Sequence, residues 1–89
     1  MKHYNITVSG TVQGVFYRQS TLEIAKQLDI KGFVRNEPNG NVYMEVEGTE
    51  GQLNTLVEWC KKGPSRAYVD DVKSTEGGMK FFSLFEINR

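Results

Sequence analysis

The residues best suited to chemistry lie in one short segment, which runs from Gly10 to Arg18 and carries two glycines ahead of its final arginine. The segment joins a predicted strand to a predicted helix, where backbone N–H groups lack intrahelical partners and the helix dipole is positive. A guanidinium at the end of such a loop can hold two phosphate oxygens in a fork. The segment therefore favours binding of a phosphate or a similar oxyanion.

Two well-known phosphate loops do not fit this segment. Its glycines are four residues apart and no Lys-Ser/Thr pair follows, which disfavours ATP. The residue six positions before Arg18 is Val12 rather than a cysteine, so a cysteine phosphatase loop does not fit either. A purely structural interpretation is also open: Ser20 could cap the helix with Glu23 returning the bond, leaving Arg18 solvated. Spacing alone does not decide between these interpretations.

The elements around the loop follow from the pattern of apolar residues. Alternation predicts a strand over residues 4–8 that stops at Ser9-Gly10, and three- and four-residue spacing predicts a helix over 18–29. Further strands are predicted over 32–36 and 42–46. The turn between them contains Asn-Gly, a strong hairpin signal, so these two strands should be antiparallel neighbours.

A second helix is predicted from Thr49, which forms a capping box with Gln52. It should end at Lys61-Lys62, before Gly63-Pro64. Its expected apolar face consists of Leu53, Leu56, Val57 and Cys60. Strands near residues 67–73 and 80–87 complete the chain.

The order of elements predicts an α+β fold, a ferredoxin-like βαββαβ sandwich. It should have an antiparallel sheet, two helices on one face and an extra C-terminal strand, in a single domain over residues 1–89. A strand, helix, strand unit forms a right-handed crossover, so the first two strands should run in the same direction. The loop after Val8 and the side chain of Asn36 are therefore expected at the same end of the molecule.

Composition excludes several functional classes. The 89 residues carry 11 basic and 11 acidic side chains, and this zero net charge disfavours a generic nucleic-acid binder. A single cysteine, Cys60, and a single histidine, His3, exclude an internal disulfide and a soft-metal cluster. No stretch approaches the roughly 20 apolar residues that span a bilayer, so no membrane contact and a cytoplasmic location are expected.

Several other residues carry structural expectations. We expect His3 to be solvated on the polar side of the first strand, and Cys60 to be buried on the apolar face of the second helix. Phe81, Phe82 and Phe85 are expected in the core, although Phe81 and Phe82 cannot both face inward.

The chain resembles the acylphosphatases through two signature stretches, in the order and at the spacing of that family. The first is Val12-Gln13-Gly14-Val15-Phe16-Tyr17-Arg18 and the second is Gly32-Phe33-Val34-Arg35-Asn36, followed by Gly40-Asn41-Val42 and Gly48. The resemblance covers nearly the whole chain. It implies hydrolysis of acyl phosphates, in which water attacks phosphorus and a carboxylate leaves.

The resemblance also implies the roles of individual residues. Arg18 and Asn36 are the implied catalytic residues: Arg18 holds the substrate phosphate and Asn36 positions the attacking water. The implied phosphate-binding backbone amides are those of Val12, Gln13, Gly14, Val15, Phe16, Tyr17 and Arg18. A small acyl phosphate is the implied partner, inorganic phosphate or sulfate a product-like ligand, and no cofactor or metal is implied. A monomer is expected for a chain of this size.

One alternative function stays open, and two residues depart from the family pattern. The alternative is a non-catalytic ferredoxin-like module that binds a phosphorylated small ligand or RNA. RNA is disfavoured because Glu45 and Glu47 accompany Tyr43 on the third strand. Thr11 stands where a basic residue is common, and Glu37 stands where many members carry an uncharged residue, so both should weaken attraction of an anionic substrate.

Overall fold

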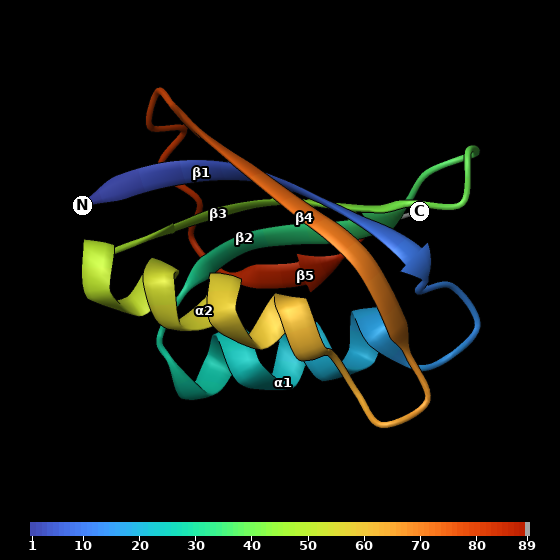
Figure 1. The fold of residues 1–89 in the computed structure, drawn as a ribbon. Helices are drawn as coiled ribbons and strands as arrows, with labels where there is room; N and C mark the ends of the chain where they lie inside the picture. The colour runs from blue at the N-terminus through green and yellow to red at the C-terminus, as the bar shows by residue number, and fades with distance from the viewer. Residues whose placement is uncertain (89) are drawn as a thin grey trace.

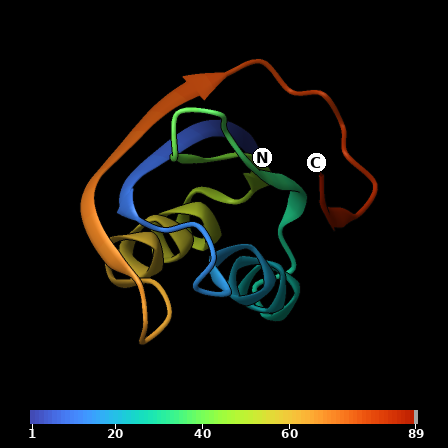
Figure 2. The same ribbon diagram turned by 90° about the vertical axis from the view of Figure 1, so that its right-hand side faces the viewer.

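The elements of the computed structural model, which describes residues 1–88, follow the predicted order. They are β1 (Lys2–Thr11), α1 (Tyr17–Gln27), β2 (Lys31–Asn36), β3 (Val42–Gly48), α2 (Glu50–Lys62), β4 (Tyr68–Gly77) and β5 (Phe85–Ile87). Both helices lie on the same face of the sheet (Figures 1 and 2). The predicted ferredoxin-like sandwich is confirmed. Arg89, the last residue of the predicted domain, lies outside the described residues.

The sheet has the strand order β4-β1-β3-β2-β5. β3 is antiparallel to both β1 and β2, so β1 and β2 run in the same direction, as the crossover predicts. β4 is antiparallel to β1, and its register shifts between Ser9 and Gly10. β1 thereby continues to Thr11, beyond its predicted end at Ser9-Gly10.

The last strand differs from its prediction. β5 covers only Phe85–Ile87, and it pairs in parallel with β2 rather than antiparallel. The chain leaves β4 at one edge of the sheet, and residues 78–84 then cross to the opposite edge (Figure 2). Because they arrive at the end where β2 begins, β5 has to run beside β2 in the same direction.

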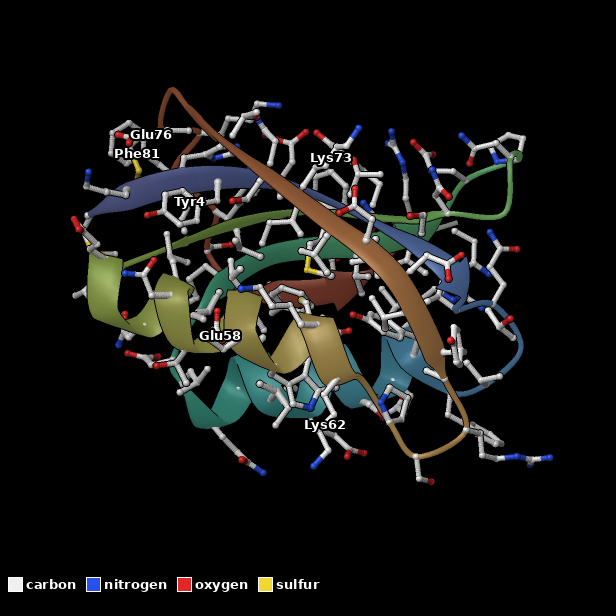
Figure 3. The ribbon with its side chains drawn as sticks, viewed as in Figure 1. Tyr4, Glu58, Lys62, Lys73, Glu76 and Phe81 are labelled. Carbon is white, nitrogen blue, oxygen red and sulfur yellow. The ribbon has the colours of Figure 1, made fainter. Side chains whose placement is uncertain are left out.

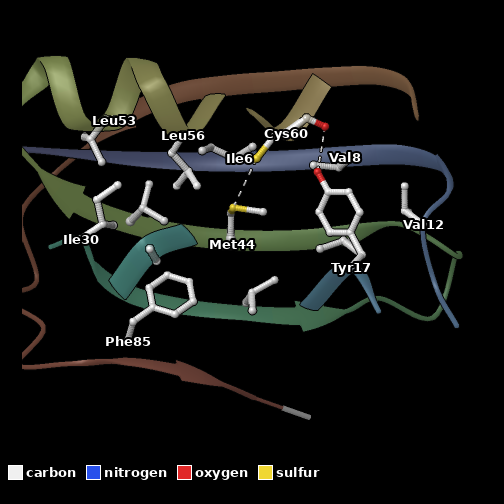
Figure 4. Close-up of a cluster of buried hydrophobic side chains, with 14 residues drawn as sticks. Ile6, Val8, Val12, Tyr17, Ile30, Met44, Leu53, Leu56, Cys60 and Phe85 are labelled. Carbon is white, nitrogen blue, oxygen red and sulfur yellow. Dashed lines mark hydrogen bonds between the residues drawn. The ribbon is translucent and has the colours of Figure 1, made fainter. Parts of the chain in front are cut away.

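The core lies between the sheet and the two helices (Figure 4). Ile6, Val8, Met44 and Val46 are fully buried on the sheet, and α2 contributes Leu53, Leu56 and Cys60. The predicted apolar face of α2 is thus confirmed, with Val57 at its partly buried edge. Burial raises the pKa of Cys60 to about 12, so its thiol stays protonated and unreactive at neutral pH.

His3 is buried, contrary to its predicted solvation. Its Nδ1 lies 2.8 Å from Oε2 of Glu47, and its Nε2 lies 2.9 Å from Oδ1 of Asn5 and 3.2 Å from Oε1 of Glu45. The ring also stacks on Phe82, with centroids 5.9 Å apart. The segment that crosses the sheet covers this histidine, a long-range contact that strand alternation does not reveal.

Residues 78–84 are held against the sheet by the carboxylate of Glu47. It accepts hydrogen bonds from the backbone N–H groups of Lys80 and Phe82, at 2.6 and 3.0 Å. Phe82 is half-buried against the ring of His3, whereas Phe81 is 80% exposed and lies away from both helices (Figure 3). The expected core position of Phe85 is confirmed, whereas the core positions expected for Phe81 and Phe82 are wrong, because Phe81 is exposed and Phe82 packs on His3 and Phe33 outside the core.

Candidate active site

Helix α1 begins without a side-chain cap. Its N-cap residue is Phe16, which adopts a left-handed conformation with φ 64°, and the first helical residue is Tyr17. Ser20 lies inside the helix, where its N–H donates to the carbonyl of Phe16 at 3.0 Å. The alternative in which Ser20 caps the helix is therefore wrong.

The early start of α1 leaves its first N–H groups available. The first four N–H groups of a helix have no intrahelical partner, and here they belong to residues 16–19. No side chain caps them, and the dipole makes this end of α1 positive. These N–H groups can therefore bind an anion.

The loop before α1 is anchored through its buried side chains. Val12 and Tyr17 are each 1% exposed, and the hydroxyl of Tyr17 donates to the carbonyl of Cys60 at 2.8 Å (Figure 4). Gly63 ends α2 beneath this ring, where a Cβ would lie 2.7 Å from Cε2 of Tyr17. Burial raises the pKa of Tyr17, which keeps it a neutral structural donor.

A cavity of about 840 Å³ brings the loop, the start of α1 and the end of β2 together. Its lining residues are Val12, Gly14, Phe16, Tyr17, Arg18, Gln19, Asn36 and Ile87. Arg18 and Asn36 thus line one cavity, and the loop after Val8 lies at the same end of the molecule as Asn36, as strand direction predicted. Gln19 and Ile87 were not predicted. Gln19 follows Arg18 in the first turn of α1, whereas Ile87 reaches the site only through the pairing of β5.

Two residues of the predicted loop do not line the cavity. The side chain of Val15 packs against the core. The side chain of Gln13 instead donates through Nε2 to the carbonyls of Glu37 and Asn41, at 2.8 and 2.9 Å.

Asn36 carries a polar atom with unused bonding capacity. Its Oδ1 is buried and accepts no hydrogen bond from any of residues 1–88. Leaving a buried acceptor unpaired costs about 1–3 kcal/mol, so such atoms usually have a bound partner. In this cavity, Oδ1 of Asn36 is suited to accept a hydrogen bond from a bound water molecule.

The two arginines near the site differ in their partners. Arg35 pairs with Glu37, with Nε 3.2 Å from Oε2. The ion pairs within residues 1–88 do not involve Arg18, which is half-buried at the cavity. The charge of Glu37 is therefore balanced locally, while the guanidinium of Arg18 is free to bind an anion.

Among residues 1–88, no three side chains of His, Cys, Asp or Glu gather as a metal would require. None of the helices in this part of the chain has the length and apolar character needed to cross a bilayer.

Comparisons with known proteins agree on one family. The family model described as Acylphosphatase matches residues 4–87. The chain is 47% identical over 76 residues to an acylphosphatase of Marinobacter nauticus, covering 85% of this chain and 83% of that one. It is 51% identical over 83 residues to an acylphosphatase of Geobacter metallireducens, covering 89% of each. The crystal structure of acylphosphatase from Bacillus subtilis superimposes with a TM-score of 0.97 at 33% identity, over 100% of both chains.

Proposed function

The chain belongs to the acylphosphatase family, and from this premise we propose that Arg18, Asn36 and the loop over residues 12–18 form its active site. The reaction is hydrolysis of the carboxyl–phosphate bond of an acyl phosphate, giving a carboxylate and inorganic phosphate. Family membership supports this enzyme over the non-catalytic alternative. The outer face of the sheet, which an RNA-binding module would use, is crossed by residues 78–84.

The first task of the site is to hold the phosphoryl group. The unpaired N–H groups at the start of α1 and the guanidinium of Arg18 face the cavity from the loop side. They supply donors for the equatorial oxygens, where negative charge is spread in the transition state. Because these donors are fixed by the fold, little reorganisation is needed during the reaction.

The second task is to position the nucleophile. Oδ1 of Asn36 accepts a hydrogen bond from a water molecule and directs its oxygen at phosphorus. The new P–O bond forms as the bond to the acyl oxygen breaks, and the carboxylate leaves with the electron pair. A carboxylate is a good leaving group and needs little general-acid help, and a phosphate oxygen takes the proton from the water. The unpaired, buried Oδ1 of Asn36 in the cavity that Arg18 also lines is the single observation that carries this assignment.

The proposal extends to the ligands, the assembly and the location of the protein. The substrate phosphate binds in a cradle formed by the N–H groups at the start of α1 and the guanidinium of Arg18. Inorganic phosphate, which is the product, binds in the same cradle, and so does sulfate. The protein works as a monomer and as a single domain over residues 1–89. It acts in the cytoplasm and needs no metal or cofactor.

Hydrolysis of benzoyl phosphate, followed spectrophotometrically with and without EDTA, tests the proposal. We expect turnover that EDTA does not change. Losing one pre-organised donor costs about 2.7–4 kcal/mol, so Arg18→Gln should lower kcat by at least about a hundredfold with the fold intact. Arg66→Gln, at an exposed arginine outside the cavity, is the matched control and should keep full activity. An Arg18→Gln variant with most of its activity would refute the assigned role.

A further inference from the structure

The side-chain amide of Gln13 joins two loops that are distant in sequence. Its Nε2 donates to the carbonyl of Glu37 at 2.8 Å and to the carbonyl of Asn41 at 2.9 Å, across separations of 24 and 28 residues. The side chain is half-buried. An NH₂ group has two hydrogens, so each carbonyl receives one of them and the donor capacity of the amide is fully used.

Both acceptors belong to the turn that follows Asn36. Within that turn the N–H of Glu37 donates to the carbonyl of Asn41 at 2.8 Å, and the N–H of Gly40 donates to the carbonyl of Glu37 at 3.1 Å. Gln13 therefore binds a turn that is already closed by its own backbone. Such a turn moves as a unit, and Asn36 is covalently attached to its first residue.

These two bonds are the polar connection between the phosphate loop and the end of β2. Within residues 1–88, no other hydrogen bond links residues 12–16 to residues 36–41. Asn36 makes no bond through Oδ1 that would fix its position from the other side. The pairing of Asn36 with Val42 holds its backbone in the sheet, and the bonds of Gln13 add the polar link that fixes this strand end relative to the phosphate loop.

We propose that Gln13 is a positioning residue, which sets the place of Asn36, and hence of the attacking water, relative to the bound phosphate. The inference rests on the proposed function. Reaction requires the attacking oxygen about 3–3.5 Å from phosphorus, and a misplacement of about 1 Å costs about a hundredfold. Without the link, the cradle still binds phosphate, but the water is misaligned.

The variant Gln13→Met tests this role, because methionine has a similar length and no N–H donor. We expect kcat for benzoyl phosphate to fall about tenfold to a hundredfold. KM and the inhibition constant of inorganic phosphate should change by less than about threefold, since the cradle and Arg18 remain. The control is Gln27→Met at the exposed end of α1, which should leave both constants unchanged. Should Gln13→Met not fold, Gln13→Leu also removes the donor without adding a charge and carries the same expectation.

A double-mutant cycle with Asn36→Ala separates positioning from a general structural effect. If Gln13 acts through Asn36, Gln13→Met should lower kcat less than about twofold in the Asn36→Ala background. The same loss in both backgrounds, or a parallel loss of phosphate affinity, would overturn the positioning role. If Asn36→Ala alone kept full kcat, the proposed function of Asn36 would fail instead, whatever Gln13 does.

Discussion

Helix α2 begins with a complete capping box, whereas helix α1 begins at a phenylalanine without a cap. At α2, the hydroxyl of Thr49 accepts from the N–H of Gln52 at 3.2 Å, and the Gln52 side chain accepts from the N–H of Thr49 at 2.8 Å. At α1, Phe16 has no side-chain hydrogen bond and is 68% exposed. One helix start binds its own capping residues, and the other has no side-chain cap, as the proposed phosphate site requires.

The same contrast holds in the side chains around each helix start. The loop before α1 is fixed by groups that bind elsewhere: Tyr17 donates to Cys60, and Gln13 donates to the turn after β2. These contacts hold the loop without occupying the donors at the start of α1. A conformation such as that of Phe16 costs about 1–2 kcal/mol for a non-glycine residue, and the anchors offset this cost.

Among the variants that test this difference between the two helix starts, one that gives α1 a side-chain cap should change kcat/KM most. Phe16→Asp places a carboxylate beside the N–H groups, where it competes with the substrate phosphate. Two charges about 8 Å apart at an effective dielectric constant of about 20 repel by about 2 kcal/mol, so kcat/KM should fall about thirtyfold. Phe16→Asn, with the same shape and no charge, is the control. Equal kcat/KM values for the two variants would show that this helix start does not face the substrate.

Removing the cap of α2 should lower the stability of the protein and leave its activity unchanged. Thr49→Ala is expected to lower the free energy of unfolding by about 1 kcal/mol, measured by urea denaturation, with kcat/KM changed less than about twofold. Thr55→Ala, inside the same helix at an exposed position, should change stability by less than about 0.5 kcal/mol. A loss of activity in Thr49→Ala without a loss of stability would reverse the roles assigned to the two helix starts.

A smaller effect concerns acid, and it should arise on the outer face of the sheet, where Glu45 and Glu47 contact residues 78–84. Burial raises the pKa of Glu47, but the N–H groups of Lys80 and Phe82 and the ring of His3 together hold it below the usual 4.5. Similarly, Lys80 and Tyr43 outweigh burial and lower the pKa of Glu45.

The sign of the pH effect follows from these lowered values. As the pH falls, these two carboxylates take up protons at a higher pH in the unfolded chain than in the folded protein. Their contribution to the free energy of unfolding is therefore present above about pH 4.5 and is lost as the pH falls further. Urea denaturation at pH 7 and at pH 3.5 should show this loss, and Glu47→Gln should show less of it. An equal loss in Glu47→Gln would place the acid sensitivity elsewhere.

Local signals in the sequence predicted most of the fold. The capping box at Thr49, the Asn-Gly turn and the apolar face of α2 are each set by neighbouring residues, and all three are confirmed. The burial of His3 and the parallel β5 depend on residues 78–84 crossing the whole sheet, which no local pattern encodes. Long-range chain paths are therefore where the sequence interpretation failed.

The site was predictable in part, for the same reason. Strand direction placed the loop after Val8 and Asn36 at one end of the molecule, and Arg18, which ends this loop, shares a cavity with Asn36. The left-handed Phe16 and the bridge made by Gln13 were not foreseen, because each depends on contacts that form only when the two loops meet. The pattern of apolar residues does not show that the side chain of Gln13 binds the turn after β2 and does not line the cavity.

Titration of the ¹⁵N-labelled protein with inorganic phosphate, followed by NMR, tests the central claim most directly. We expect saturable shifts of the backbone amides at the start of α1, residues 16–19, and none at residues 50–52 of α2. Arg18→Gln should weaken this binding. Shifts of equal size at both helix starts, or none at saturating phosphate, would contradict the claim that α1 alone keeps its donors for the substrate.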